Sequence, residues 1–377
     1  MVTSEQVSAA LAGVRYPEIH RPITELGMVK GVDVSPAGEV TVGVYLTVAG
    51  CPMRDTITRD VTAAVAPLAG VTGVRVDLDV MSAEQRRGLQ EMLRGPGAPA
   101  NEIPFAKPGS LTRVYAVASG KGGVGKSSVT VNLAVALANR GRSVGVVDAD
   151  IYGHSVPRML GVTGKPTQVD QMIMPPQASG VRVISIGMFT PGNTAVVWRG
   201  PMLHRALQQF LADVYWGDLD VLLLDLPPGT GDIAISVAQL LPSAELLVVT
   251  TPQPAAQEVA ERAGSIALQT HQQIAGVVEN MSWWEQADGT RVDLFGSGGG
   301  AAVAESLAKL TGGRVPLLGQ VPIDQRVREG GDAGVPIVLS DPGSPAAVAL
   351  RGVADKLAAR QRGLAGMQLG LAPTSRA

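Results

Sequence analysis

Short apolar runs rich in β-branched residues alternate with longer stretches of helical periodicity from Leu111 to about Arg362. This alternation is typical of a parallel sheet with helices on both faces, because strands buried on both faces read as continuous apolar runs. The predicted strands are RVYAVAS, SVGVVDAD, VRVISIG, VLLLDL, ELLVVTT and IAGVVEN, at residues 113–119, 143–150, 181–187, 221–226, 245–251 and 274–280. The predicted fold class is therefore α/β, with a mostly parallel sheet flanked by helices.

A second pattern precedes this region. Residues 1–94 mix helical and strand-like periodicity and end in the charged helical run SAEQRRGLQEMLR, which predicts a small α/β domain. Residues 95–111 are rich in Pro, Gly and Ala and predict a flexible, partly extended linker. The larger domain then covers 112–362, and the tail 363–377 has little to fold with and is predicted to be disordered.

Composition and charge exclude several classes of protein. Hydrophobic residues make up 45% of the 377 residues, yet no apolar stretch approaches the roughly 20 residues that span a bilayer. The N-terminus has no signal-peptide pattern, and a net charge of -2 gives no electrostatic reason for nucleic-acid binding. We therefore expect a cytoplasmic protein with neither a membrane nor a nucleic acid as partner. The four histidines are scattered, which argues against a histidine metal site.

The stretch GKGGVGKS satisfies the phosphate-loop pattern G-x-x-x-x-G-K-S and lies between a predicted strand and a predicted helix. Backbone N–H groups of such a loop and the helix N-terminus converge on phosphate oxygens, the second lysine reaches the β- and γ-phosphates, and the serine ligates Mg²⁺. The predicted ligands are therefore ATP and Mg²⁺. The predicted ATP-binding residues are Gly120, Lys121, Gly122, Gly123, Val124, Gly125, Lys126 and Ser127.

Acidic residues follow two of the predicted strands. Asp225 ends the apolar run VLLLD, where it can bind Mg²⁺ through water, and the nearby Gly229 can present a backbone N–H to the γ-phosphate. Asp148 and Asp150 end the run VVDAD. They are either a simple helix cap or part of the nucleotide site, and the phosphate loop upstream favours the site.

With its first lysine, the loop resembles the deviant Walker A motif of the MinD, ParA, NifH and ArsA group of ATPases. The resemblance implies a homodimer in which Lys121 contacts the phosphates bound by the partner subunit, so that hydrolysis depends on dimerisation; the alternative is a solvated surface lysine. It also implies that Asp148 supports the Mg²⁺ shell, that Asp150 positions or activates the attacking water, and that Asn280 contacts adenine. Lys121, Lys126 and Asp150 are the predicted catalytic residues.

Further motifs are similar to the Mrp/ApbC family of ATP-binding iron–sulfur cluster carriers, from about Thr112 to Val338. They are VDADIYGHSVPRMLG, RGPM, YWGDLDVLLLDLPPGTGDI, VVTTPQ, GVVENMS and FGSGGG. YPEIHRPITELGMV and LTVAGCPMRDTI resemble the small domain of the SufT and PaaD families, with Tyr16 in place of the usual aspartate and Cys51 retained. The resemblance implies an ATPase that binds iron–sulfur clusters and transfers them to apoproteins, with client proteins or assembly factors as partners.

One departure from this family concerns the cluster ligands. Its carriers place a Cys-x-x-Cys pair shortly after ENMS, where this chain has Glu285 and Asp288, and Cys51 is the only cysteine. Carboxylates match poorly a cluster that thiolates normally hold. Cys51 could serve a labile or partner-completed cluster, act as a nucleophile or persulfide acceptor, or be a buried structural residue. Trp283 and Trp284 could form a partner-docking loop or pack at a dimer interface.

These alternatives leave a second function open. A nucleotide-gated, dimeric interaction ATPase would recruit a partner without carrying a cluster. MinD-type recruitment to a membrane would need a basic amphipathic C-terminal helix, which the tail lacks. No second substrate pocket can be identified in the sequence to support an ATP-driven ligase.

Overall fold

The computed structural model describes residues 2–48, 53–95, 102–107, 109–150, 153–189, 200–229, 232–253, 256–286 and 288–359. The chain forms two compact units, and each is described by itself. Unit 1 contains residues 1–102, 164–176 and 213–217, and unit 2 contains the rest of the chain. The predicted tail 363–377 and Cys51 lie outside the described residues.

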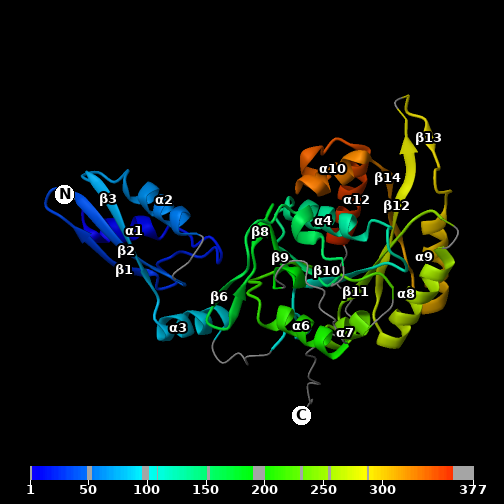
Figure 1. Ribbon diagram of the computed structural model, residues 1–377, viewed down its shortest axis with the longest axis horizontal. Helices are drawn as coiled ribbons and strands as arrows, with labels where there is room; N and C mark the ends of the chain where they lie inside the picture. The colour runs from blue at the N-terminus through cyan, green and yellow to red at the C-terminus, as the bar shows by residue number, and fades with distance from the viewer. Residues whose placement is uncertain are drawn as a thin grey trace, which may run out of the picture. The chain divides into compact units, whose positions relative to one another are not determined.

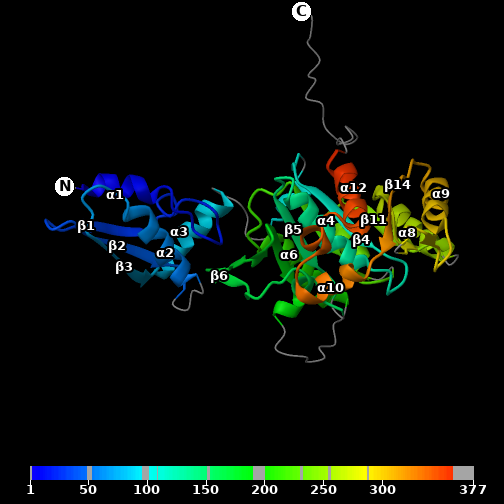
Figure 2. The ribbon, with the colours of Figure 1, turned by 90° about the horizontal axis from the view of Figure 1, so that it is seen from above.

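Unit 1 is built on a three-stranded sheet in the order β1-β2-β3, in which β1 and β2 are antiparallel and β2 and β3 are parallel (Figure 2). Capping boxes begin two of its helices: Thr3 caps α1 and Ser82 caps α3, each together with the glutamine three residues later. The elements of residues 1–95 are α1 (Ser4–Leu11), β1 (Val29–Val34), β2 (Glu39–Leu46), α2 (Arg54–Val65), β3 (Gly73–Val80) and α3 (Ala83–Arg94).

A hairpin from the middle of the chain also belongs to unit 1. Strands β6 (Thr167–Val169) and β7 (Met172–Met174) pair antiparallel, and α3 packs on β6. Val169, Met172 and Met174 are buried in the same apolar cluster as the core of residues 2–93, and the Thr167 hydroxyl donates to Glu18 Oε1 at 2.7 Å. The two units are therefore not the two contiguous segments predicted from the sequence, because these apolar side chains find their core in unit 1.

One short turn of the predicted linker is packed. Residues 104–106 form a short 3₁₀ helix, η1 (Pro104–Ala106), and the side chains of Ile103 and Phe105 are buried in unit 2. Contacts with α6 (Gly200–Ala212) hold this turn in place. The prediction of a flexible linker therefore fails for residues 103–107, because two apolar side chains interrupt its Pro- and Gly-rich composition and gain free energy by burial.

Unit 2 contains a sheet in the order β13-β12-β11-β4-β10-β5-β9-β8, with β14 also paired to β12. All strand pairs are parallel except β12 with β13 and β8 with β9, at the two ends of that order. The α/β fold with a mostly parallel sheet is therefore confirmed. Its strands are β4 (Arg113–Ala118), β5 (Val144–Asp148), β8 (Gln177–Ala178), β9 (Val181–Ser185), β10 (Val221–Asp225), β11 (Glu245–Thr250), β12 (Ile274–Glu285), β13 (Arg291–Val292) and β14 (Leu317–Ile323).

Helices cover both faces of this sheet. Figure 1 shows α4 and α12 on one face and α6 and α7 on the other, and α8 lies beside α9. The central strands are buried on both faces, which explains their continuous apolar runs. The remaining helices of unit 2 are α4 (Lys126–Ala138), α5 (Val156–Met159), η2 (Ile186–Met188), α7 (Asp232–Leu240), α8 (Ala256–Thr270), α9 (Gly299–Thr311), α10 (Gln325–Ala333), α11 (Ile337–Ser340) and α12 (Pro345–Ala359).

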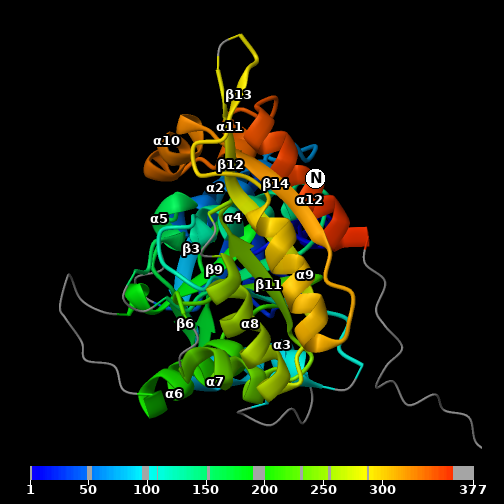
Figure 3. The same ribbon diagram turned by 90° about the vertical axis from the view of Figure 1, so that its right-hand side faces the viewer.

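Strand β12 is longer than the sequence predicts. It continues through Met281 to Glu285 and pairs there with β13, so that a hairpin extends beyond the rest of the sheet (Figures 1 and 3). The family's cysteine positions therefore lie on and beside this hairpin. Among the described residues, no helix combines the length and apolar character needed to cross a bilayer.

Candidate nucleotide site

The phosphate loop connects β4 to α4, as predicted. Gly123 and Gly125 have positive φ angles of 79° and 78°, which glycine adopts without strain. A Cβ atom at Gly125 would also lie 2.3 Å from Asn280 Nδ2. Gly125 therefore serves both the turn and the close approach of β12, and it begins helix α4, whose N-terminus faces the loop.

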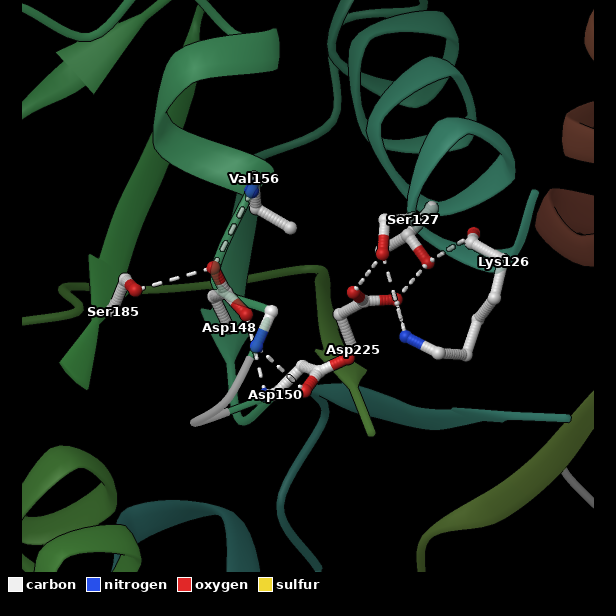
Figure 4. Close-up of polar contacts among 9 residues, drawn as sticks. Lys126, Ser127, Asp148, Asp150, Val156, Ser185 and Asp225 are labelled. Carbon is white, nitrogen blue, oxygen red and sulfur yellow. Dashed lines mark hydrogen bonds and ion pairs between the residues drawn. The ribbon is translucent and has the colours of Figure 1, made fainter. Parts of the chain in front are cut away.

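Lys126, Ser127 and Asp225 form one polar cluster, in which Lys126 and Asp225 are buried and Ser127 is half-buried (Figure 4). Lys126 Nζ lies 2.8 Å from Asp225 Oδ1, and the Ser127 hydroxyl donates to Asp225 Oδ2 at 2.6 Å. Thr130 adds a hydrogen bond of 2.8 Å to the same carboxylate. The structure thus brings together two of the three residues predicted as Mg²⁺ ligands. A hydroxyl beside a carboxylate is a hard oxygen donor set that fits Mg²⁺.

Asp148, the third residue predicted to support Mg²⁺, has other partners. One oxygen accepts from the backbone N–H of Asp150 at 3.2 Å, and the other accepts from Val156 N–H at 3.3 Å and from the Ser185 hydroxyl at 3.1 Å (Figure 4). The carboxylate therefore holds both ends of the loop after β5. Burial, and secondly the negative charge of Asp225, raise the pKa of Asp148 to about 8. In this arrangement Asp148 positions the loop that carries Asp150.

Asp150, the predicted water-activating residue, lines the cavity next to the phosphate loop. Its Oδ1 accepts a hydrogen bond from Gly153 N–H at 3.1 Å, so the side chain is turned onto its own loop. Figure 4 shows Asp148, Asp150 and Asp225 at the same edge of the sheet. The carboxyl ends of adjacent parallel strands gather these groups at the edge of the sheet where the phosphate loop also lies, as expected for a ligand site of an α/β sheet.

Two predicted nucleotide contacts have partners within the protein. The Gly229 N–H donates to the Ser119 carbonyl at 2.9 Å, so its predicted bond to the γ-phosphate requires this bond to break. Asn280 Nδ2 donates to the carbonyl of Val124 at 2.9 Å, which attaches β12 to the phosphate loop. Asn280 also lines the cavity. Its contact with adenine remains a prediction.

The first lysine of the loop has a different partner from Lys126. Lys121 Nζ donates to Gln253 Oε1 in the connection between β11 and α8. Both side chains are half-buried, and Lys121 also lines the cavity. Lys121 is therefore partly covered by its own subunit, and its contact with the partner's phosphates remains a prediction. The sequence alone offered no signal that Gln253 would be the partner.

A cavity of about 1020 Å³ opens above the phosphate loop. Its polar floor contains the loop itself, and its wall includes residues that sequence reasoning did not assign: Trp284, Leu294 and Phe295 near the β12–β13 hairpin, and Ile323 and Arg328 on β14 and α10. The Ser119 hydroxyl at the base is buried and has no hydrogen-bond partner among the described residues. A polar floor with an apolar wall suits a ligand that has phosphates and a ring.

At the two positions where the family has cysteines, this chain has the carboxylates of Glu285 and Asp288, on and beside the hairpin. The guanidinium of Arg291 lies over the Trp283 ring, 4.3 Å from its centroid, and Trp284 lines the cavity. Glu285 and Arg291 are opposite each other in the backbone register of β12 and β13. Asp288 is exposed, and its pKa is lowered by hydrogen bonds from Thr290. Within the described part of the chain, no three His, Cys, Asp or Glu side chains gather as a metal site.

In unit 1, the residue that replaces the usual aspartate is part of the core. Tyr16 is fully buried, and its hydroxyl lies 3.2 Å from Thr47 Oγ1. Nearby, Glu18 Oε2 is buried with no hydrogen-bond partner among the described residues, and burial raises the pKa of the Glu18 carboxyl. Cys51, the retained residue of this motif, lies outside the described ranges.

The fold and the site together define one class of protein. A parallel sheet, a phosphate loop with two lysines and an acidic edge beside it are the features of a nucleotide-binding P-loop NTPase. The chain belongs to the family described as NUBPL iron-transfer P-loop NTPases, which matches residues 110–358. Residues 4–78 match a second family, described as iron–sulfur cluster assembly proteins. These matches confirm the resemblance indicated by the sequence motifs.

Relatives extend over the whole chain. The iron–sulfur cluster carrier protein of Mycobacterium tuberculosis (strain H37Rv) is 66% identical over 370 residues, which are 98% of this chain and 97% of the relative. A protein of the same name from Synechocystis is 39% identical over 368 residues, 96% and 98% of the two chains. Among solved structures, a nucleotide-binding protein from Archaeoglobus fulgidus in complex with ADP is 37% identical, with a TM-score of 0.51, and covers 59% of this chain and 87% of that one.

Proposed function

We propose that this protein is a cytoplasmic, homodimeric ATPase that carries iron–sulfur clusters and transfers them to apoproteins. One observation carries the proposal: a cavity built on the two-lysine phosphate loop, in a chain whose full-length relatives are named as cluster carriers. In this proposal the cluster is the transferred substrate, and ATP hydrolysis drives its transfer.

ATP binds with its phosphates on the loop and its base toward the apolar wall. Lys126 leaves Asp225 for the β- and γ-phosphates, which replaces one charge-assisted contact by another. Ser127 and Asp225 would hold Mg²⁺, which would supply positive charge against the phosphate oxygens. The Asn280 carboxamide still has an oxygen acceptor for the adenine amino group while its nitrogen holds the phosphate loop.

Hydrolysis transfers the γ-phosphoryl group to water. The water oxygen forms a bond to phosphorus, the bond from phosphorus to the β–γ bridging oxygen breaks, and ADP keeps the electron pair. Asp150 orients the water and accepts one of its protons before releasing it to solvent. Asp148 assists by holding the loop on which Asp150 lies.

The trans role of Lys121 makes hydrolysis depend on dimerisation. Lys126 is buried in an ion pair of its own subunit, whereas Lys121 is half-buried at the cavity edge and has a neutral partner. From this edge Lys121 reaches the phosphates of a second copy and stabilises the charge that develops there, as an arginine finger does. Closure of the dimer around ATP then couples the nucleotide state to binding and release of the cluster.

The cluster needs thiolates, and each chain supplies one. Glu285 and Asp288 offer only carboxylate oxygens, which do not fit an iron–sulfur cluster. We place the thiolate at Cys51, so that a homodimer provides two of the four usual ligands and the donor or client protein completes the set. Such incomplete ligation favours a labile, transferable cluster.

Anaerobic reconstitution with iron and sulfide tests the cargo. Visible absorbance and iron per protomer are measured for the wild type, for Cys51→Ser and for Lys126→Ala as a control with intact thiols. A cluster that forms in the wild type and in Lys126→Ala but is lost in Cys51→Ser supports the assignment. A cluster that survives Cys51→Ser places the ligands elsewhere and refutes it.

A second candidate is a nucleotide-gated scaffold that carries no cluster. The observation that favours it is an apolar surface beside the cavity, where Trp284, Leu294 and Phe295 are 44%, 54% and 39% exposed. If neither the wild type nor the control binds iron, while ATP still promotes self-association, this function replaces the carrier.

A further inference from the structure

Lys121 and Gln253 follow the carboxyl ends of two adjacent parallel strands, β4 and β11. Lys121 follows β4 in the phosphate loop, and Gln253 lies three residues past the end of β11, in the connection to α8. The ammonium group of Lys121 donates to the amide oxygen of Gln253. Among the described residues this is the hydrogen bond found for the Lys121 side chain.

The position of Gln253 is fixed by the FGSGGG segment. Its neighbour Pro252 packs so closely on the start of α9 that a Cβ atom at Gly299 would lie 2.6 Å from the Pro252 carbonyl oxygen. On the other side, Arg262 of α8 donates to the carbonyl of Gly120 at 3.1 Å, next to Lys121. Both partners of the Lys121–Gln253 hydrogen bond are therefore anchored to the body of unit 2.

The two lysines of the loop differ in the charge of their partners. Lys126 pairs with a buried carboxylate, whereas Lys121 has a neutral amide, and the described residues place no carboxylate in an ion pair with it. A neutral acceptor orients an ammonium group but leaves its positive charge uncompensated. Lys121 can therefore exchange Gln253 for a phosphate, because the new contact would be a full ion pair.

We propose that Gln253 is a positioning residue that retains Lys121 in its own subunit until the nucleotide of a second copy draws the lysine across. The inference rests on the trans role of Lys121 proposed above. Gln253 then raises the protein concentration needed for dimer-dependent hydrolysis, because its hydrogen bond to Lys121 must break before the lysine can act. A carboxylate at this position would hold the lysine too firmly, and an apolar residue would release it.

The first test measures ATPase rate against protein concentration for the full chain. In Gln253→Leu, the concentration that gives half-maximal rate per protomer should fall about tenfold, the size of effect expected from a hydrogen bond to a charged group. In Gln253→Glu it should rise. Gln269→Leu, an exposed glutamine on α8, is the matched control and should change nothing. In a Lys121→Ala background, Gln253→Leu should have no effect.

The second test follows Lys121 directly in nucleotide-free protein. Amine acetylation by a water-soluble N-hydroxysuccinimide ester is measured by mass spectrometry, with the exposed Lys309 as internal reference. Acetylation of Lys121 should be several-fold faster in Gln253→Leu than in the wild type, with Lys309 unchanged. An unchanged rate at Lys121 overturns the retention by Gln253, whatever the ATPase shows.

The two tests separate this inference from the function on which it rests. If Gln253→Leu lowers the maximal rate as Lys121→Ala does, Gln253 presents the lysine to its target, and retention is refuted. If Lys121→Ala hydrolyses ATP normally, the trans role itself fails, while the acetylation result still decides whether Gln253 holds the lysine.

Discussion

Asp148 and Asp225 end adjacent parallel strands in register, yet their carboxylates have different partners. Asp225 accepts from Lys126, Ser127 and Thr130 in the phosphate loop and its helix, whereas Asp148 accepts from the loop that carries Asp150. Although they end equivalent strands, Asp225 therefore contacts the phosphate loop and its helix, and Asp148 contacts the loop after β5. The first four predictions concern the two lysines of the phosphate loop, Asp150 and Asp148.

Lys126→Ala should abolish nucleotide binding. The variant removes the cation that faces the phosphates and leaves Asp225 as a buried carboxylate without its ion pair, which also costs stability. Titration calorimetry with ATP and Mg²⁺ measures the binding, and thermal unfolding measures the stability. Lys309→Ala, at an exposed site, is the control. Wild-type affinity in Lys126→Ala would contradict the assignment of the loop.

Lys121→Ala should retain ATP binding and lose hydrolysis. Its partner Gln253 is neutral and exchangeable, so the fold does not depend on the lysine. A loss of about 10³-fold or more in turnover is expected by analogy with cations supplied in trans. Steady-state turnover and ATP affinity are measured together. A variant that hydrolyses ATP at the wild-type rate would refute the trans role.

Asp150→Ala should also bind ATP and lose turnover. Among the described residues its carboxylate accepts a hydrogen bond from Gly153 of the same loop, so its removal should leave the phosphate loop intact. Asp150→Asn keeps the hydrogen-bond acceptor but not the basicity, so it should be as inactive as Asp150→Ala if the residue accepts a proton. If either variant fails to bind ATP, Asp150 is structural.

Asp148 should make the nucleotide-free protein less stable as the pH rises. Its folded pKa of about 8 lies above the ordinary value of 3.8, so the folded state holds a proton that the unfolded state has released. The stabilising contribution is complete below the ordinary pKa and is lost as the pH approaches the folded one. The free energy of unfolding in urea, measured from about pH 5 to about pH 8, should fall less steeply in Asp148→Asn.

The control for this pH series is Asp355→Asn on the exposed side of α12. It should show the slope of the wild type, because the carboxylate lies at the surface. An equal slope in Asp148→Asn and the wild type would show that Asp148 does not take up a proton on folding. Any loss of stability that is independent of pH reflects the altered hydrogen bonds to Val156 and Ser185.

Met172→Ala should destabilise unit 1 although its position in the sequence lies inside the NTPase region. The side chain is buried in the core of residues 2–93, and truncation of a buried methionine costs about 2–5 kcal/mol. Hydrogen exchange of residues 2–95 measures the effect, with the half-exposed Met202→Ala as control. Unchanged protection in β1 to β3 would place the hairpin outside this core.

Much of the site could be predicted because its chemistry is local. The phosphate loop, its two lysines and the helix that follows form one continuous stretch, and the glycines specify the turn by their backbone freedom. Asp148 and Asp225 could each be placed at a strand end because each follows a continuous apolar run in the sequence. The α/β fold followed from the same apolar runs.

Other features depend on partners that are distant in the chain. The partners of Lys121 and Asn280 are 132 and 156 residues away, and nothing in the local pattern of either residue indicates them. The orientation of Asp148 depends on Ser185, and the β6–β7 hairpin joins a core made by the first 93 residues.

The sequence by itself therefore determined the main elements of the α/β fold and the position of the phosphate loop, since backbone freedom and hydrophobic period act over neighbouring residues. Only the tertiary structure decided which carboxylate contacts Lys126 and Ser127, which amide holds Lys121 and which unit receives the hairpin. Those choices arise from the packing of strands and loops that the chain brings together from far apart, where burial and hydrogen bonding select one partner among many.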